Sequence, residues 1–512
     1  MILTNIIFSN LKKPLPLVLK SSGKLFWLTC LTGIIAISQT GCNTAPGNKI
    51  ISADSMPAIE PDYSMITVPP NIAPLNFKIN EEGTAFYAYF SSGESSGFGV
   101  SSKDGSIIIP SDKWERMLQA NIGGQYVVEL YSKGNDGKWI KYQSIKNTIA
   151  KEETDPYLYY RLLYPGYESW SELSINYRAL DSFKEKALIE NRVADENCIN
   201  CHSFNNGKSD DFLFHMRGSH GGTYFHSKGS FRKVNLKTTS MKNSAVYPRW
   251  HPSGKFVAFS SNMTIQQFHS ADNKKVEVSD LESSLVLYDV EKNEITDIPL
   301  AGKENFMDTY PEWSPDGTWL YFCRALQVGE NFNYDQIRYN LFRVKFDHES
   351  RSFGEAELIF DASNSGKSTA FPRISPNGKY LVMTVFDYGC FPIWHKEADL
   401  FSIDLDSIKT TRLQLNSNFT DSYHSWSANG KWIVFSSKRL DGLTARPFFA
   451  YINDDGTSEK PFVLPQKDPG FYNSFLKSFN IPEFSTEKIN LSPGVIRKLS
   501  KTPAIQASRD PK

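Results

Sequence analysis

The sequence has no excess of charge of either sign. Its 512 residues include 56 Lys and Arg against 56 Asp and Glu, so the formal net charge is zero. No basic run marks a nucleic-acid-binding surface, and we therefore expect no nucleic-acid partner. Apolar runs are also short, since the run Leu25–Ile37 is too brief to cross a bilayer comfortably. We expect a folded protein that meets a membrane only through an anchor.

Aromatic residues and turn formers are abundant by contrast. The chain holds 35 Phe, 24 Tyr and 10 Trp, together 13% of its residues, and such residues favour pleated sheets. It also has 32 Gly and 27 Pro, which suits many tight turns. The length exceeds that of one ordinary domain. We predict a mainly β protein of several domains.

The N-terminal residues are typical of an export signal. Four lysines precede the apolar run Leu25–Ile37, and Gln39-Thr40-Gly41-Cys42 follows it. This resembles the lipobox of bacterial lipoproteins, in the relaxed form of Bacteroidetes, with Gln39 and Thr40 departing from the usual pattern. The resemblance implies a signal peptide at 1–41, a lipidated Cys42 and a polar tether at 42–62. An uncleaved N-terminal anchor is the alternative. Both place the protein in the cell envelope, facing the periplasm, and a lipid anchor would put it at the outer membrane.

Two segments separate this signal from the rest of the chain. Short alternating or apolar runs divided by Gly-rich turns predict a β-sandwich-like domain over 63–150. We expect one helix there, Ser111–Ala120, with Ser111 as its cap and Trp114 packed inwards. Residues 151–222 are predicted to be a short helical segment, which contains the motif described next.

One motif carries recognisable chemistry. Cys198-Ile-Asn-Cys201-His202 has the C-x-x-C-H pattern by which c-type haem is attached. Two thiols three residues apart can form thioethers with the two vinyl groups of one haem, and the adjacent imidazole can then bind the iron. We therefore predict one covalent haem c. A redox-active pair and a strained disulfide are alternatives, as is a zinc site completed by nearby histidines, namely His215, His220 and His226.

The sixth position of the iron has several candidate ligands in Phe212-Leu-Phe-His215-Met216-Arg217-Gly-Ser-His220. Met216 is the preferred candidate and His215 the next, because thioether and imidazole are both common axial ligands. An open position would instead permit catalysis. Arg217 could pair with a haem propionate.

Two further cysteines, Cys323 and Cys390, lie in neighbouring repeats. In an exported protein they could form a disulfide, and two buried free thiols fit equally well. Their spacing does not decide between these states.

Internal repeats occupy the second half of the chain. Four segments share a pattern of an aromatic residue, a proline or its substitute and a Gly-containing turn: Tyr247-Pro-Arg-Trp250-His-Pro-Ser-Gly254, Tyr310-Pro-Glu-Trp313-Ser-Pro-Asp-Gly317, Phe371-Pro-Arg-Ile374-Ser-Pro-Asn-Gly378 and Ser422-Tyr-His-Ser-Trp426-Ser-Ala-Asn-Gly430. Their glycines are 63, 61 and 52 residues apart, a spacing typical of propeller blades. Each unit predicts four strands.

These repeats resemble the PD40 repeats of TolB-like β-propellers over about residues 245–465. We predict a propeller at 223–485 with five or six blades, and a C-terminal tail at 486–512. The segment Tyr224–Leu236 would form outer strands of an incomplete blade, so that strands from both ends of the chain close the ring and remove exposed edges.

The order of anchor, β domain, C-x-x-C-H motif and repeats resembles Bacteroidetes lipoproteins described as TolB-like or cytochrome-c-containing propeller proteins. That resemblance implies architecture and haem, not a reaction. Our first hypothesis is an electron carrier of the periplasm with an unidentified redox partner or envelope protein. The alternatives are a haem-dependent oxidoreductase and a haem-free protein-binding scaffold. No local Ser/His/Asp signature is recognisable, so an electron carrier or binding protein is favoured over a hydrolase.

Overall fold

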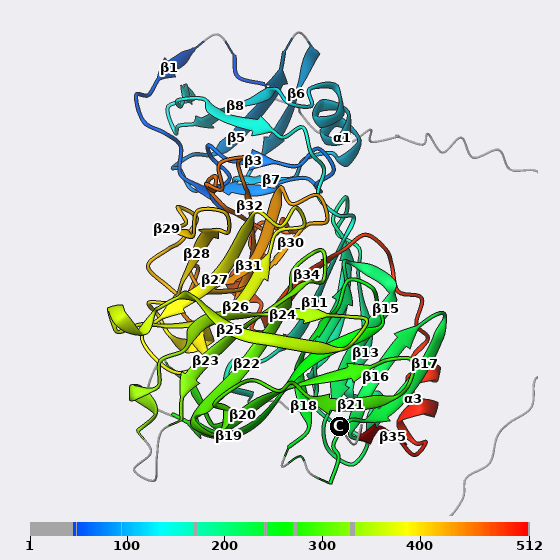
Figure 1. The fold of residues 1–512 in the computed structure, drawn as a ribbon. Coiled ribbons are helices and arrows are strands. Elements are labelled where there is room, and N and C mark those ends of the chain that lie inside the picture. Colours follow the sequence, from blue (N-terminus) through cyan, green and yellow to red (C-terminus); the bar gives the residue numbers. More distant parts are fainter. Residues whose placement is uncertain are drawn as a thin grey trace, which may run out of the picture. The chain divides into compact units, whose positions relative to one another are not determined.

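Six sheets, each with four antiparallel strands, follow the N-terminal β domain, and two of them are extended by a fifth, parallel strand. The computed structural model describes residues 45–47, 49–93, 95–167, 172–239, 241, 243–269, 274–327 and 333–509 (Figure 1). The expected signal peptide and Cys42 lie outside these residues. Within the described ranges no helix is both long and apolar enough to span a bilayer.

Each of the six sheets is one blade, in which the strands follow one another from the centre of the ring outwards. Blade 1 contains, in that order, β34 (Ser478–Ser485), β11 (Tyr157–Leu163), β12 (Ser174–Ala179) and β13 (Glu185–Glu190). Blade 2 contains β14 (Ile199–Asn205), β15 (Lys208–Met216), β16 (Gly222–Ser227) and β17 (Ser230–Asn235). Blade 3 contains β18 (Ala245–Trp250), β19 (Phe256–Phe268), β20 (Val276–Asp289) and β21 (Glu294–Asp297).

The remaining blades come from the later repeats. Blade 4 contains β22 (Phe306–Trp313), β23 (Trp319–Leu326), β24 (Asn340–Asp347) and β25 (Ser352–Phe360). Blade 5 contains β26 (Ser368–Ile374), β27 (Tyr380–Phe386), β28 (Asp399–Asp404) and β29 (Lys409–Arg412). Blade 6 contains β30 (Asp421–Trp426), β31 (Trp432–Ser437), β32 (Arg446–Tyr451) and β33 (Phe462–Val463). Single helical turns connect some strands: η1 (Pro165–Tyr167), η3 (Asn191–Ala194), η4 (Lys303–Asn305), η5 (Tyr334–Gln336), η6 (Ser363–Ser365), η7 (Pro392–Trp394) and α2 (Phe471–Ser474).

The innermost strands form a closed ring. β14, β18, β22, β26, β30 and β34 each contact the next, and β34 contacts β14 again. β34 follows the last repeat, yet it pairs antiparallel with β11 from the start of the propeller (Figure 1). The protein is therefore a six-bladed β-propeller. Strands from both ends of the chain close the ring as expected, which leaves no inner strand as an exposed edge. The blade that they complete is blade 1, however, and the segment Tyr224–Leu236, expected to belong to an incomplete blade, contributes to β16 and β17 of blade 2, whose first four strands are consecutive in the chain.

The repeat tryptophans join neighbouring blades. Trp250 Nε1 donates a hydrogen bond to the carbonyl of Ser203 at 3.4 Å, in the inner strand of the preceding blade. Trp313 Nε1 reaches the carbonyl of Arg249 at 3.2 Å in the same way. Each such bond contributes on the order of 1 kcal/mol, in addition to the burial of the indole ring. The repeat signature thus encodes contacts between blades as well as the hairpin turns.

The segment 151–222 is not helical, contrary to the prediction. It forms β11 to β15, which are the three outer strands of blade 1 and the first two strands of blade 2. In β11, the consecutive residues Leu158, Tyr159 and Tyr160 are all buried, because neighbouring blades cover both faces of the sheet. A continuous apolar run is ambiguous between a buried helix and a buried strand, and here its packing between blades selects the strand. The propeller therefore begins near Tyr157, well before residue 223.

The C-terminal residues are not a free tail. α3 (Pro493–Ser500) buries Ile496, while β35 (Ile505–Gln506) and β36 (Ser508–Arg509) add parallel strands to blades 2 and 3. Apolar side chains hold this segment to the propeller, since Ile496 is only 1% exposed. The predicted C-terminal tail therefore adds a strand to the outer edge of each of two blades.

A smaller β domain precedes the propeller. One sheet contains β1 (Ile50–Ser52), β3 (Thr67–Val68), β5 (Ala85–Ser92), β6 (Ser95–Ser102), β8 (Gln125–Lys133), β9 (Trp139–Lys141) and β10 (Ile145–Ile149). The other contains β2 (Ile59–Glu60), β4 (Phe77–Ile79) and β7 (Ser106–Ile107). β1 and β2 lie within the predicted tether, so the ordered domain starts earlier than residue 63.

The predicted helix of this domain is confirmed as α1 (Ser111–Ala120), with Trp114 buried. The predicted cap is wrong, because Ser111 is the first helical residue. Pro110 takes the cap position without a side-chain hydrogen bond. Proline is compatible with this place, since the first turn of a helix does not need its missing N–H.

Candidate functional site

One residue of each innermost strand adopts a left-handed backbone conformation. These six residues, which we call the collar, have φ between 44° and 54°: Ile481, Cys201, Tyr247, Tyr310, Phe371 and Tyr423. At each of them the pairing register with the neighbouring strand shifts. The six line a small cavity of about 40 Å³ at the centre of the ring. Non-glycine residues in this conformation are uncommon, and they are retained where the surrounding structure imposes them.

The C-x-x-C-H motif belongs to this collar. Cys201 occupies the position of the repeat aromatic residue, and His202 occupies that of the repeat proline. Ser203 and Phe204 then correspond to the following polar and aromatic positions of the repeat. The motif therefore lies in β14, the innermost strand of blade 2. Sequence comparison could have found this, because Asn206-Gly207 supplies the same kind of hairpin turn as the other repeats.

The two thiols of the motif are buried and free. Cys198 is 5% exposed and Cys201 is 9% exposed. Burial raises the pKa of the Cys198 thiol, although the positive charges of Arg161 and Arg217 oppose this. Both cysteines are thus in the reduced state, and two guanidinium groups lie near the first of them.

His202 is the most unusual member of the motif. Its side chain is fully buried, and neither ring nitrogen makes a hydrogen bond of ordinary geometry with the described residues. Burial, with Arg161 and Arg249 nearby, lowers the pKa of His202 to about 3. The closest carboxylate oxygen, Oε2 of Glu483, lies 3.9 Å from Nε2. A neutral imidazole with unsatisfied nitrogens is costly when buried, and it is also the form that binds metals.

A cavity of about 340 Å³, which we call the axial cavity, adjoins the motif. Cys201 and Asn200 form part of its wall, and Arg161, His215 and Arg217 line it as well. Its volume is in the range of small-molecule and cofactor sites. Two guanidinium groups in one wall favour a ligand that carries carboxylates.

The structure separates the two candidates for the sixth ligand. His215 lines the axial cavity, where its Nδ1 lies 3.3 Å from the Thr223 hydroxyl, and burial lowers its pKa to about 3. Met216 points to the other face of β15 into the hydrophobic core, where it is fully buried. The Tyr224 hydroxyl donates to its sulfur at 3.5 Å. Adjacent residues of a strand face opposite sides, so only one of the two can face the cavity.

Of the three histidines considered for zinc, only His215 shares a cavity with Cys201, and His220 and His226 have other partners. His220 Nε2 contacts the carboxylate of Asp195 at 2.7 Å, and His226 Nδ1 contacts the carbonyl of Ser209 at 2.6 Å. Among the described residues no group of three or more His, Cys, Asp or Glu side chains is arranged to hold a metal ion.

A second cavity of about 340 Å³, which we call the charged cavity, is lined by inner-strand residues two positions after the collar. Arg249 Nε binds Glu312 Oε2 at 2.9 Å, and Arg373 approaches the same oxygen at 3.4 Å. Arg249 also lies 3.8 Å from Glu483. Burial raises the pKa of Glu312 and of Glu483 to about 7, against the effect of Arg249. No single repeat contains this arrangement, so sequence reasoning missed it.

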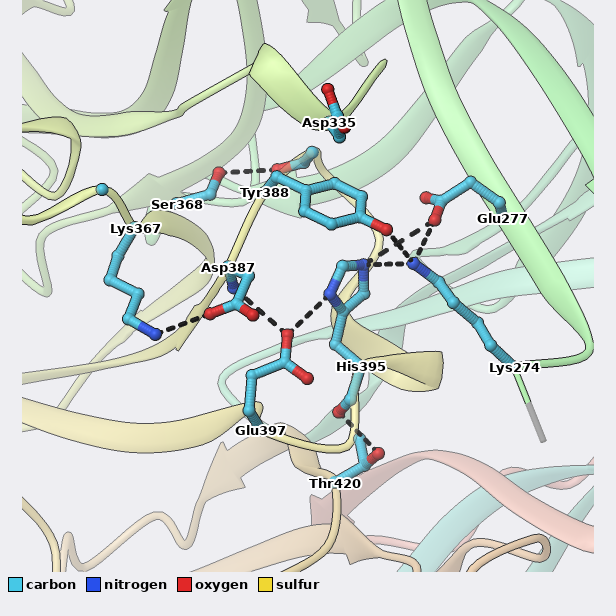
Figure 2. Close-up of polar contacts among 12 residues, drawn as sticks. Lys274, Glu277, Asp335, Lys367, Ser368, Asp387, Tyr388, His395, Glu397 and Thr420 are labelled. Atoms are coloured by element: carbon cyan, nitrogen blue, oxygen red, sulfur yellow. Dashed lines mark hydrogen bonds and ion pairs between the residues drawn. The ribbon is translucent and has the colours of Figure 1, made fainter. Parts of the chain in front are cut away.

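A buried ionic network lies close to the axial cavity (Figure 2). Lys274 forms an ion pair with Glu277 and donates to the Tyr388 hydroxyl at 2.9 Å and to His395 Nε2 at 3.0 Å. Since an ammonium group can only donate, Nδ1 of His395 carries the proton towards Glu397 at 2.9 Å. The network ties the start of β20 to the connection between β27 and β28. Val276 and Phe391, from those two segments, line the axial cavity, so the network supports its wall.

The last two cysteines are free. Cys323 and Cys390 are both buried, and no disulfide joins them. Burial raises the pKa of each thiol. Of the two states left open by the sequence, the structure contains the buried thiols.

Comparison with known proteins identifies no family. No protein-family model matches the chain, and no curated protein matches it significantly. Solved structures similar to it include TolB from Acinetobacter baumannii, at 12% identity and a TM-score of 0.42, covering 73% of this chain and 85% of that one. A hypothetical selenium-binding protein from Sulfolobus tokodaii has 9% identity and a TM-score of 0.40, covering 67% and 96% respectively. A puromycin-hydrolysing peptidase from Mycobacterium tuberculosis has 12% identity and a TM-score of 0.35, covering 66% and 50%. The assignment of the propeller therefore rests on the six sheets of this chain.

Proposed function

We propose that the protein is a c-type cytochrome of the cell envelope, with one haem attached through Cys198 and Cys201 and with His202 as an axial ligand of its iron. One observation carries the proposal. The imidazole of His202 is buried and neutral, and neither of its ring nitrogens makes a hydrogen bond of ordinary geometry with the described residues; two free buried thiols lie in the same motif. Such an arrangement is costly in an empty protein, and a metal bond at the imidazole would remove the cost.

The axial cavity supplies further groups suited to haem. Arg161 and Arg217 would pair with the two propionates, because guanidinium groups bind carboxylates in bidentate fashion. His215 is the better placed of the two sixth-ligand candidates, since Met216 faces the core. The haem would supply one-electron chemistry, and the protein would supply a cavity with two guanidinium groups in its lining. We propose electron transfer to a redox partner or another envelope protein as the function.

The proposed location rests on the N-terminal sequence. Lipidation of Cys42 would tether the propeller to a membrane, and we propose the outer membrane with the protein facing the periplasm. Thioether attachment of haem takes place outside the cytoplasm, so the two parts of the proposal are consistent.

The deciding measurement is a pyridine haemochrome spectrum of the denatured chain after export in a host that matures c-type cytochromes. We expect a covalent haem signal in the parent and none in a Cys198→Ala/Cys201→Ala variant. A Cys323→Ala/Cys390→Ala variant serves as the matched control, because it removes two buried thiols outside the motif and should retain haem. A well-folded parent without haem would overturn the proposal.

The sixth ligand is tested with the haem-loaded protein. We expect His215→Ala to alter the visible spectrum and to open the iron to carbon monoxide, whereas Met216→Leu leaves the spectrum unchanged. Carbon monoxide binding by the parent itself would instead favour a haem-dependent oxidoreductase, because that chemistry needs an open position.

A haem-free binding scaffold is the second candidate, and the charged cavity favours it. That cavity presents buried carboxylates and guanidinium groups from several blades, independently of the motif. Absence of haem from the folded parent would leave this function.

A further inference from the structure

Lys438 is a buried amine without a polar partner. It follows β31 in blade 6 and is only 6% exposed. Its Nζ makes no hydrogen bond with any described residue, and it lies 3.0 Å from the centroid of the Trp394 ring. An ammonium group in this place would have the face of the Trp394 ring but no hydrogen-bond acceptor among the described residues, and burial disfavours the charged form. Burial therefore favours the neutral amine.

A small cavity adjoins this amine. It has a volume of about 40 Å³, and its walls come from blades 1, 5 and 6. Leu163, Trp394 and Asn480 are among its lining residues together with Lys438, and most of its surface is apolar. Asn480 Oδ1 is also buried without a hydrogen-bond partner among the described residues. The same cavity thus has an unpaired amine and an unpaired acceptor oxygen in its walls, and it has room for a very small molecule.

The amine of Lys438 and the acceptor oxygen of Asn480 together indicate which kind of ligand the cavity could hold. A neutral amine is a nucleophile towards carbonyl carbon, whereas the ammonium of an ordinary surface lysine is not. Burial lowers the pKa of Lys438 well below its usual value, which increases the fraction of neutral amine at neutral pH. A small hydroxyaldehyde matches both orphaned groups, because its carbonyl can react with the amine while its hydroxyl donates to Asn480 Oδ1.

We propose that Lys438 is a covalent capture site for small hydroxyaldehydes. The Nζ attacks the carbonyl carbon and forms a C–N bond, the carbonyl oxygen leaves as water, and a Schiff base remains. No oxidant or reductant is required, since imine formation only exchanges oxygen for nitrogen. The site is separate from the C-x-x-C-H motif and does not depend on haem.

The test uses the full chain with glycolaldehyde in limiting amount and cyanoborohydride, which reduces the imine and makes it permanent. Peptide mapping by mass spectrometry then measures labelling at each lysine. Lys409, an exposed lysine at the start of β29, is the matched internal reference. We expect Lys438 to be labelled at least about tenfold more than Lys409 at neutral pH, because each pH unit of lowered pKa increases the neutral fraction tenfold.

The controls separate reactivity from access and from folding. In denatured chain the two lysines should be labelled equally. Lys438→Met should lose the label at this peptide while retaining its thermal transition, since methionine suits a buried apolar site. Asn480→Leu should reduce labelling by glycolaldehyde more than labelling by acetaldehyde, which has no hydroxyl. Labelling of Lys438 in the folded chain at or below the level of Lys409 would overturn the proposal.

Discussion

The buried amine of Lys438 makes the stability of the propeller depend on pH in a calculable way. The perturbation is Lys438→Met, which keeps an unbranched side chain of similar length and removes the titrating group. In the folded chain burial lowers the pKa of this amine and favours its neutral form, because Nζ has no hydrogen-bond partner among the described residues. In the unfolded chain the same amine is protonated up to about pH 10.4.

The magnitude follows from proton linkage. The unfolded state binds one more proton than the folded state at every pH between the two pKa values, so stability rises with pH there by about 1.4 kcal/mol per pH unit. Above the unfolded pKa the gain stops. Between about pH 8 and pH 10 a parent whose folded-state pKa lies below this range should therefore gain roughly 2.5 kcal/mol relative to Lys438→Met, which lacks this proton. Other titrating groups are common to both proteins and cancel in the difference.

The assay is urea unfolding followed by tryptophan fluorescence at a series of pH values, with the free energy of unfolding compared between the two proteins. Lys409→Met is the control, because this exposed side chain should show no such slope. Parallel curves for the parent and Lys438→Met would refute the reasoning, since they would mean that the folded chain keeps the amine protonated.

Three further outcomes follow from buried groups. Phe479→Ala, in the strand that closes the ring, should lower the free energy of unfolding by about 3–5 kcal/mol, because the side chain is fully buried. Urea unfolding measures this loss of stability, and a loss below about 1 kcal/mol would contradict the prediction. Arg324→Met should cost about 3–5 kcal/mol by leaving Asp308 buried without its bidentate partner. The double variant Arg324→Met/Asp308→Leu should recover most of this loss in the same assay, and no recovery would speak against the pairing. Cys323 and Cys390 should resist a thiol reagent in the folded chain, and both should react after unfolding without reductant. Absence of labelling at both cysteines after unfolding would indicate a disulfide.

The sequence predicted the parts of the fold that are encoded locally. Turn glycines such as Gly317 and Gly378 have the positive φ that hairpins require, so four blades were visible from spacing alone. Blade 1 was not, because its inner strand β34 is some 300 residues from β11 and no local pattern connects them. The aromatic run of β11 was wrongly predicted to be helical, since only packing between blades shows that it is a strand.

The candidate site was likewise predicted only in the features that are local in sequence. Cys198, Cys201 and His202 were identified from their spacing, which is a local property. Their position in the collar and the choice of His215 over Met216 as the cavity-lining residue depend on register within blade 2. The charged cavity needs residues of several blades, so it exists only in the closed ring.

The closure of the ring by β34 also fixes an order of events. β14, which holds the motif, contacts β34, and the thiols of Cys198 and Cys201 are 5% and 9% exposed once the ring is complete. The closing strand lies at residues 478–485, so nine-tenths of the chain must emerge from a ribosome or an export channel before it can dock. Until then β14 lacks one of the two inner strands that it contacts in the closed ring. The haem attachment proposed above would therefore have a time window, which begins when β14 appears and ends when β34 docks.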